Sequence, residues 1–170
     1  MKRPDVPWVV CWSAEMLFDV RVCPWADNRA ALWQPDLPGQ GKAIFEDLHV
    51  VRARRAVWEW LCPICAEPTE EGHRWWFGKG KADLIREDGT SWAWATANAP
   101  TCRRCAETAE DACPHLVSGG WHPMPFPMPD AIVASRITQA KGITLLQGQS
   151  VVGPLYFTWR TLPKGVIHAG

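Results

Sequence analysis

The sequence lacks an excess of charge of either sign. Lys+Arg and Asp+Glu both number 18 among 170 residues, so the formal net charge is zero. A protein that binds nucleic acid without sequence preference usually carries net positive charge or a concentrated basic patch. The balanced total argues against the first and leaves the second open.

Long apolar runs are also missing. No window approaches the roughly 18 consecutive apolar residues of a membrane helix. The apolar stretch near the N-terminus is interrupted by Pro7, Ser13 and Glu15, which is not the pattern of a secretory signal peptide. We therefore expect a cytoplasmic protein. In a reducing compartment its seven cysteines favour metal ligation over disulfides.

Tyrosine occurs once, as Tyr156, whereas tryptophan occurs 12 times and proline 15 times. With 47% apolar and 21% charged residues, the composition is that of a globular domain. Tryptophans of a small domain mostly fill its core, because each buries a large area. The alternative is an exposed aromatic face that stacks on bases or binds a protein partner.

Two stretches give the clearest signals of secondary structure. Residues 43–61 contain no Gly or Pro and place Ile44, Leu48, Val51 and Trp58 on one stripe, which predicts a helix that Pro63 stops. Residues 27–42, rich in Pro and Gly, read mostly as loop. Short segments rich in Val, Ile, Trp and Phe predict strands at 6–12, 18–22, 74–77, 84–86, 91–94, 131–137, 143–146 and 155–159.

Two further segments connect these elements. Asp-Gly within residues 87–90 is typical of a hairpin turn. Residues 119–129 carry proline at 123, 125, 127 and 129 and predict an extended linker or strap.

Two C-x-x-C pairs are the strongest functional signal. Cys62 and Cys65 precede the predicted hairpin, and Cys102 and Cys105 open a helix-forming run that ends at Pro114. A structural zinc ion takes four N or S ligands in a tetrahedron. The order of knuckle, hairpin and second pair is typical of a treble-clef or ribbon-like module, so the sequence predicts one structural Zn²⁺ on these four cysteines.

Other cysteines and histidines are weaker candidates. If the run after Cys105 is helical, Cys113 lies roughly 12 Å along the axis at ~1.5 Å per residue, too far to share a zinc ion. A second metal on Cys113, His115 and His122 stays open, although a role at the helix end is preferred for Cys113 and His115. Cys11 and Cys23 lie in or beside strand-like segments and are expected to be buried.

A zinc deaminase is the enzyme alternative. It would use Cys65, Cys102 and Cys105 as ligands, keep water in the fourth position and make Glu67 the general acid/base. Pro68 and Gly72 interrupt the helix that should follow Cys65, and Cys62 fits as a fourth ligand that closes the site. A zinc-stabilised nuclease using His73 lacks accompanying acidic or amide residues and ranks lower.

Five arginines lie close to the cysteines in sequence. Arginine suits phosphate contacts because of its fixed donor fork, and Trp75, Trp76, Trp92 and Trp94 on the hairpin could stack on bases. Nearby acids, such as Glu59 and Glu107, could instead pair with the arginines. The candidate contacts to a nucleic acid or protein partner are Arg52, Arg54, Arg55, Arg103, Arg104, Trp75 and Trp76.

The strings "LHVVRARRAVWEWLCPICAEP" and "NAPTCRRCAETAEDACPHL" resemble a family of uncharacterised actinobacterial proteins. That family carries an Arg-Arg-Ala helix, a C-x-x-C pair, an aromatic hairpin and a second pair ending in C-P-H-L. The resemblance covers roughly residues 45–117. It implies zinc and an intracellular setting, and it implies no particular activity.

Taken together, the sequence predicts an α+β protein with a central treble-clef or zinc-ribbon-like module flanked by antiparallel strands from both termini. The expected segments are 1–42, an N-terminal β segment; 43–118, the helix and zinc module; and 119–170, a Pro-rich strap and C-terminal strands. We expect an intracellular binding protein for a protein partner or nucleic acid, with zinc in a structural role.

Overall fold

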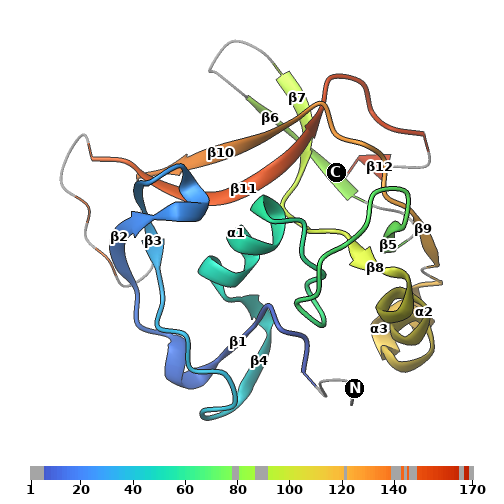
Figure 1. Ribbon diagram of the computed structural model, residues 1–170, viewed down its shortest axis with the longest axis horizontal. Helices are drawn as coiled ribbons and strands as arrows, with labels where there is room; N and C mark the ends of the chain where they lie inside the picture. Colours follow the sequence, from blue (N-terminus) through green and yellow to red (C-terminus); the bar gives the residue numbers. More distant parts are fainter. Residues whose placement is uncertain are drawn as a thin grey trace.

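The protein has a mixed α+β fold dominated by strands (Figure 1). The computed structural model describes residues 6–77, 81–86, 92–120, 122–138, 143, 145, 149–164 and 167–168. No helix in these ranges is both long and apolar enough to cross a membrane. Three small elements lie at the periphery: the 3-10 turns η1 (Ser13–Glu15) and η2 (Pro24–Ala26), and α3 (Pro114–Gly119).

The largest sheet is organised around β11 (Val151–Trp159). One edge of β11 pairs antiparallel with β10 (Ala131–Ile137), and the two run side by side across Figure 1. β3 (Arg29–Trp33) pairs parallel with β11 near its start, and β7 (Trp92–Thr96) pairs antiparallel near its end. The sheet is extended by β2 (Asp19–Cys23), β6 (Lys81–Arg86) and β12 (Ile167–His168).

This sheet unites the three segments expected from the sequence. β3, β7 and β11 come from residues 1–42, 43–118 and 119–170 respectively, and β11 is bonded to both of the others. Two smaller sheets complete the fold. β1 (Val10–Trp12) pairs with β4 (Ala43–Leu48), and β5 (Arg74–Phe77) lies between β8 (Thr101–Cys102) and β9 (Pro123–Pro125).

The predicted helix over residues 43–61 is wrong in its first third. Residues 43–48 form β4, and the helix α1 (Val50–Trp58) begins only after His49. His49 has extended backbone angles, and its Nδ1 accepts a hydrogen bond from the Arg52 backbone N–H at 3.2 Å. That bond satisfies one of the free amides of a helix start, so the chain changes from strand to helix at this residue.

Residues 27–42 are mostly loop and turn, as predicted, but they also include β3 in the main sheet. Several other predictions are confirmed. β5 has the predicted bounds, β10 matches 131–137, and β11 contains 155–159. The proline-rich strap is extended and supplies β9. β6 and β7 pair antiparallel, as a hairpin requires. The turn at 87–90 and half of the segment 143–146 lie outside the described residues.

Aromatic side chains form the centre of the core. Phe126, from the strap, contacts the rings of Trp60, Trp76, Phe157 and Trp159 at centroid distances of 5.1–6.3 Å. Phe157 is fully buried and Trp60 packs on it at 4.5 Å. Trp60, Trp76 and Trp159 are therefore core residues, as expected for tryptophans of a small domain. α1 packs on the same side of the sheet, against β11 and β3.

Candidate metal centre

The first cysteine pair lies in a tight loop that follows α1. The chain reverses at Trp60, which has a φ of 56°, and Leu61 then forms an isolated bridge with Pro68. Inside this loop the Cys62 N–H donates to the Glu67 carbonyl at 2.8 Å, and the Ala66 N–H donates to the Cys62 carbonyl at 2.9 Å. Ala66 has a φ of 63°, in the left-handed region. These bonds bend the chain so that both sulfurs lie on the same side of the loop.

The second pair lies where a strand becomes a helix. Cys102 ends β8, opposite Arg74 of β5, and also caps the N-terminus of α2 (Arg103–Ala112). Cys105 lies in the first turn of α2 and is 4% exposed. A helix start brings side chains three residues apart onto one face. The strand end and the first turn therefore present two sulfurs in one direction.

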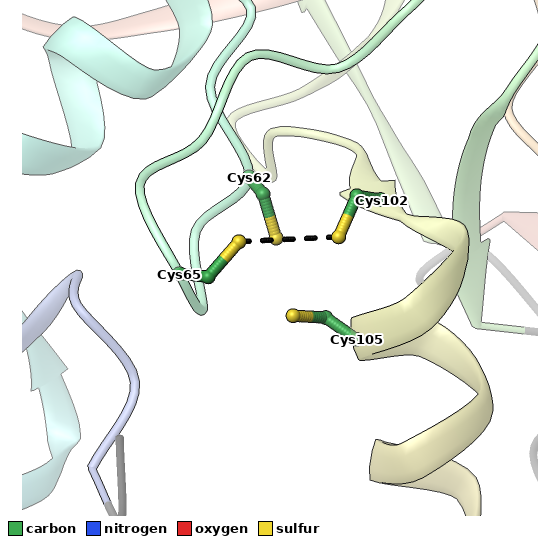
Figure 2. A group of neighbouring side chains, drawn as sticks. All are labelled: Cys62, Cys65, Cys102 and Cys105. Carbon is green, nitrogen blue, oxygen red and sulfur yellow. Dashed lines mark hydrogen bonds between the residues drawn. The ribbon is translucent and has the colours of Figure 1, made fainter. Parts of the chain in front are cut away.

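The structure brings the four cysteines together. All four sulfurs lie within 4.8 Å of one another, and Cys65 Sγ lies 3.9 Å from Cys102 Sγ. Figure 2 shows the four side chains turned toward a common centre, two from the loop and two from the β8–α2 junction. Four sulfurs at ~2.3 Å from one tetrahedral ion would be about 3.8 Å apart. The residues therefore fit a single tetrahedral metal ion.

The sulfurs have different electrostatic surroundings. Burial raises the pKa of Cys62 to about 11, against opposing hydrogen bonds from the backbone amides of Cys102, Cys65 and Ile64. Burial, and then the nearby Cys62 sulfur, raise the pKa of Cys105. For Cys65, burial acts upward, but hydrogen bonds from the Glu67 amide and the neighbouring thiols together lower its pKa. A bound cation deprotonates coordinating thiols outright, and the amides aimed at the sulfurs then stabilise the thiolates.

Arg104 adds positive charge at the edge of the cluster. Its hydrogen bond with the Cys65 sulfur, and then the charges of Cys105, Cys65 and Cys102, raise its pKa. Four thiolates around a divalent ion carry a net charge of −2, which a neighbouring guanidinium offsets. Arg104 would therefore offset part of that charge if the four cysteines hold an ion.

The position of Cys62 bears on the deaminase alternative. An open catalytic site keeps one coordination position for water, but Cys62 Sγ lies in the same cluster as the other three sulfurs. Glu67 is exposed, and its backbone rather than its side chain forms the bonds that shape the loop. The arrangement favours a closed site with four sulfur ligands.

The rival ligands lie elsewhere. Cys113 caps the C-terminus of α2 and is not among the clustered sulfurs. His122 Nδ1 lies 2.6 Å from Glu110 on the exposed face of α2, and His73 and His115 are exposed. Cys11 and Cys23 are fully buried, as predicted. Within the described ranges, none of these residues belongs to a group with metal-site geometry.

One other group of potential ligands comprises Glu15, Asp36 and His49. Both nitrogens of His49 are engaged: Nδ1 accepts from the Arg52 amide, and Nε2 lies 3.0 Å from the Pro35 carbonyl, to which only an N–H can bond. The ring is therefore the neutral Nε2–H tautomer and has no lone pair for a metal. Glu15 and His49 are fully buried and Glu15 pairs with Arg52, whereas Asp36 is exposed and lies 3.5 Å from the other side of the same guanidinium. The group is therefore a structural network around Arg52.

Two of the predicted contact arginines are buried, which corrects the prediction that they meet a partner. Arg52 is 3% exposed and bonds Glu15 and the Val10 carbonyl. Arg54 is 1% exposed and donates to the carbonyls of Leu32, Val152 and Gly153 and to the Cys23 sulfur. Neither guanidinium can reach a phosphate. In the predicted helix both residues lie off the apolar stripe, which indicates exposure. The local sequence contains no signal for the distant acceptors that bury them.

The remaining predicted contacts do not form an uncompensated basic surface. Arg55 pairs with Glu59 at 2.7 Å and lies over the rings of Trp8 and Trp25, and Arg103 pairs with Glu107 at 2.7 Å. Trp76 is 6% exposed and belongs to the aromatic core, and Trp75 is half-buried. The prediction that Trp76 stacks on bases is therefore wrong.

The chain matches no protein-family model, no curated protein and no solved structure. The resemblance to the actinobacterial family stays a prediction, and a metal centre is supported by the geometry of the four cysteines.

Proposed function

We propose that this chain is a zinc-stabilised binding protein. One observation carries the proposal. The sulfurs of two C-x-x-C pairs lie within 4.8 Å of one another, although Cys65 of the first pair and Cys102 of the second are 37 residues apart in sequence. Bound there, Zn²⁺ would link the loop after α1 to the start of α2 and so join two segments that are otherwise held by short strands. Soft thiolate ligands in a tetrahedron are typical of structural zinc.

The surrounding elements support a treble-clef-like module. A knuckle loop supplies Cys62 and Cys65, a strand supplies Cys102, and the first turn of the following helix supplies Cys105. Seven free cysteines support an intracellular, reducing setting for such a centre. A closed site of this kind holds the fold and leaves no position for an activated water, so we propose that the protein acts by binding rather than by catalysis.

The test of the centre is metal content combined with X-ray absorption at the zinc edge on the purified chain. We expect one zinc ion per chain with four sulfur neighbours. Three sulfurs and one lighter ligand would contradict the closed site and make Glu67→Ala the next variant. One iron ion in place of zinc would contradict the structural role and point to electron transfer, because iron also accepts four thiolates.

A matched pair of variants tests which cysteines hold the ion. Cys105→Ser removes a clustered ligand, and Cys113→Ser removes a cysteine one helix length away. We expect Cys105→Ser to lose zinc and Cys113→Ser to keep one zinc per chain. Loss of zinc from Cys113→Ser, with retention by Cys105→Ser, would show that the ligand set is different.

We favour a protein partner over a nucleic acid. The arginines proposed for phosphate contact are buried or paired with carboxylates, except Arg104, which faces the cluster. Fluorescence anisotropy with labelled single- and double-stranded oligonucleotides at low salt tests this choice. We expect no saturable binding at micromolar protein. Tight binding that weakens steeply with salt would favour the nucleic acid instead.

A further inference from the structure

An apolar pocket lies beside the knuckle loop. Its volume is about 400 Å³, within the range of roughly 300–1,000 Å³ typical of small-molecule sites. Residues from distant parts of the chain form its wall, including Val9 of the N-terminal segment, Ala56 of α1, Ile64 of the knuckle, Phe77 of β5 and Leu116 of α3.

The pocket exists because small side chains face it. Ala53 and Ala56 of α1 and Ala97 and Ala99 after β7 are all part of the wall. The pocket opens to solvent, so its apolar wall is in contact with water. A molecule that covers this wall would remove apolar surface from water, which is favourable, so the site is suited to an apolar occupant.

The chemistry of the wall restricts that occupant. Asn98 and Thr101 have polar side chains, and the indole N–H of Trp76 is a buried donor without a hydrogen-bond partner among the described residues. No ionisable residue is found in the wall among the residues that the structure describes. An amide and a hydroxyl can both donate and accept hydrogen bonds. They would hold a neutral hydroxyl or carbonyl group, whereas burial of an ionised carboxylate or amine there would be unfavourable without a charged partner.

We propose that this pocket binds an uncharged, largely apolar small molecule with one neutral polar end, of the chemical class of a medium-chain fatty alcohol. The inference goes beyond the zinc-stabilised binding function. It is connected to that function through the wall, because Pro63 and Ile64 lie between the ligand cysteines Cys62 and Cys65. The knuckle that encloses the metal thus forms one side of the binding site.

The experiment is a titration of the zinc-loaded full chain with N-phenyl-1-naphthylamine, an uncharged aromatic probe that fluoresces in apolar surroundings. We expect saturable binding of one probe per chain. Competition then uses three ten-carbon molecules: 1-decanol, decanoate and decylammonium. Decanol should displace the probe at concentrations at least tenfold lower than either ion. Absence of saturable binding, or equal displacement by the ions, overturns the proposal.

Two pocket-filling variants localise the site. Ala53→Phe and Leu116→Trp enlarge half-buried side chains on different elements of the wall. Each should raise the probe Kd at least tenfold while zinc content stays at one per chain. Ala112→Phe, at the exposed end of α2, should leave the Kd within twofold. If one filled variant fails to fold, the other and the competition series decide; a folded filled variant with wild-type affinity overturns the proposal.

The same measurements separate the two proposals. Full zinc occupancy without probe binding overturns the pocket and leaves the metal centre. Probe binding that is blocked by the filled variants, in a chain that holds no zinc, overturns the metal centre and leaves the pocket.

Discussion

At the scale of single residues, the unusual feature is a buried guanidinium that has no carboxylate partner within the described part of the chain. Arg54 is 1% exposed, and the acceptors around it are carbonyls of β3 and β11 and the Cys23 sulfur. Burial lowers the pKa of Arg54, and the hydrogen bond with Cys23 opposes that effect. Arg54 thus joins α1 to two strands of the main sheet. Its contribution is structural, because removal of the side chain would leave buried carbonyls without donors.

Arg54→Met should therefore destabilise the fold. We expect the free energy of unfolding to fall by about 3 kcal/mol, since several buried carbonyls lose their donors. Urea denaturation followed by circular dichroism measures the change. Arg103→Gln on the exposed face of α2 is the control and should change stability by less than about 0.5 kcal/mol. Equal effects of the two substitutions would contradict the structural role of Arg54.

His49 makes stability depend on pH. Burial lowers its pKa in the folded state, against the opposing hydrogen bond to the Pro35 carbonyl, with Arg52, Glu15 and Asp36 as the charged groups nearby. The unfolded chain binds a proton at His49 as pH falls below about 6.5, whereas the folded chain does not. Stability from His49 is thus fully present above that pH and is lost as pH falls, by up to about 1.4 kcal/mol per pH unit.

The measurement is the free energy of unfolding of the wild type and of His49→Asn as pH is lowered. The series starts at pH 7.5, about one unit above the ordinary histidine pKa. Asn caps a helix well and does not titrate. We expect a smaller slope of stability with pH in His49→Asn. Identical slopes would show that another group causes the pH dependence.

At the scale of elements, the knuckle loop combines good hydrogen bonds with one strained position. Ala66 has a φ of 63°, although its N–H closes the loop on the Cys62 carbonyl. A left-handed conformation costs a residue with a Cβ roughly 1 kcal/mol, whereas glycine adopts it freely. The loop therefore holds Ala66 in place at some expense of stability.

Ala66→Gly should raise the free energy of unfolding of the zinc-loaded chain by up to about 1 kcal/mol, because the strain at the left-handed position is removed. Zinc content should not change. Ala112→Gly, at the end of α2, is the matched control and should lower stability by up to about 1 kcal/mol, because glycine disfavours helix. Thermal and urea unfolding both measure the pair. A destabilised Ala66→Gly would contradict the loop geometry.

At the scale of the whole molecule, two regions differ in what holds them together. The main sheet buries Phe157 and Trp159 of β11 against Phe126 and its aromatic neighbours. The knuckle and α2 are joined to the rest by the short strands β5, β8 and β9 and by the cluster of four cysteines. The backbone N–H groups of Trp8 and Val9 also donate to the knuckle carbonyls of Ile64 and Pro63. Loss of a metal ion should therefore affect the second region first, because local stability follows local packing.

Chelation of zinc tests this division. We expect a strong chelator to lower overall stability by several kcal/mol, since ligand binding to the folded state alone contributes about 4 kcal/mol at a thousandfold excess over Kd. Hydrogen exchange should rise in residues 61–68 and in α2, while amides of β11 keep most of their protection. Uniform exchange across the molecule would instead indicate that the metal holds the entire fold.

Sequence spacing alone was enough to predict that the four cysteines form one cluster, because a C-x-x-C pair constrains both of its sulfurs through a few local bonds. Enrichment in Val, Ile, Trp and Phe likewise predicted β5, β10 and much of β11. The tertiary structure decided what local patterns cannot contain. Residues 43–48 became a strand because β1 is available to pair with them. Arg52 became buried because it pairs with Glu15. Arg54 became buried because it donates to carbonyls about 20 and 100 positions away in sequence. Burial of a charge depends on partners from distant segments, and only the folded chain brings those partners together.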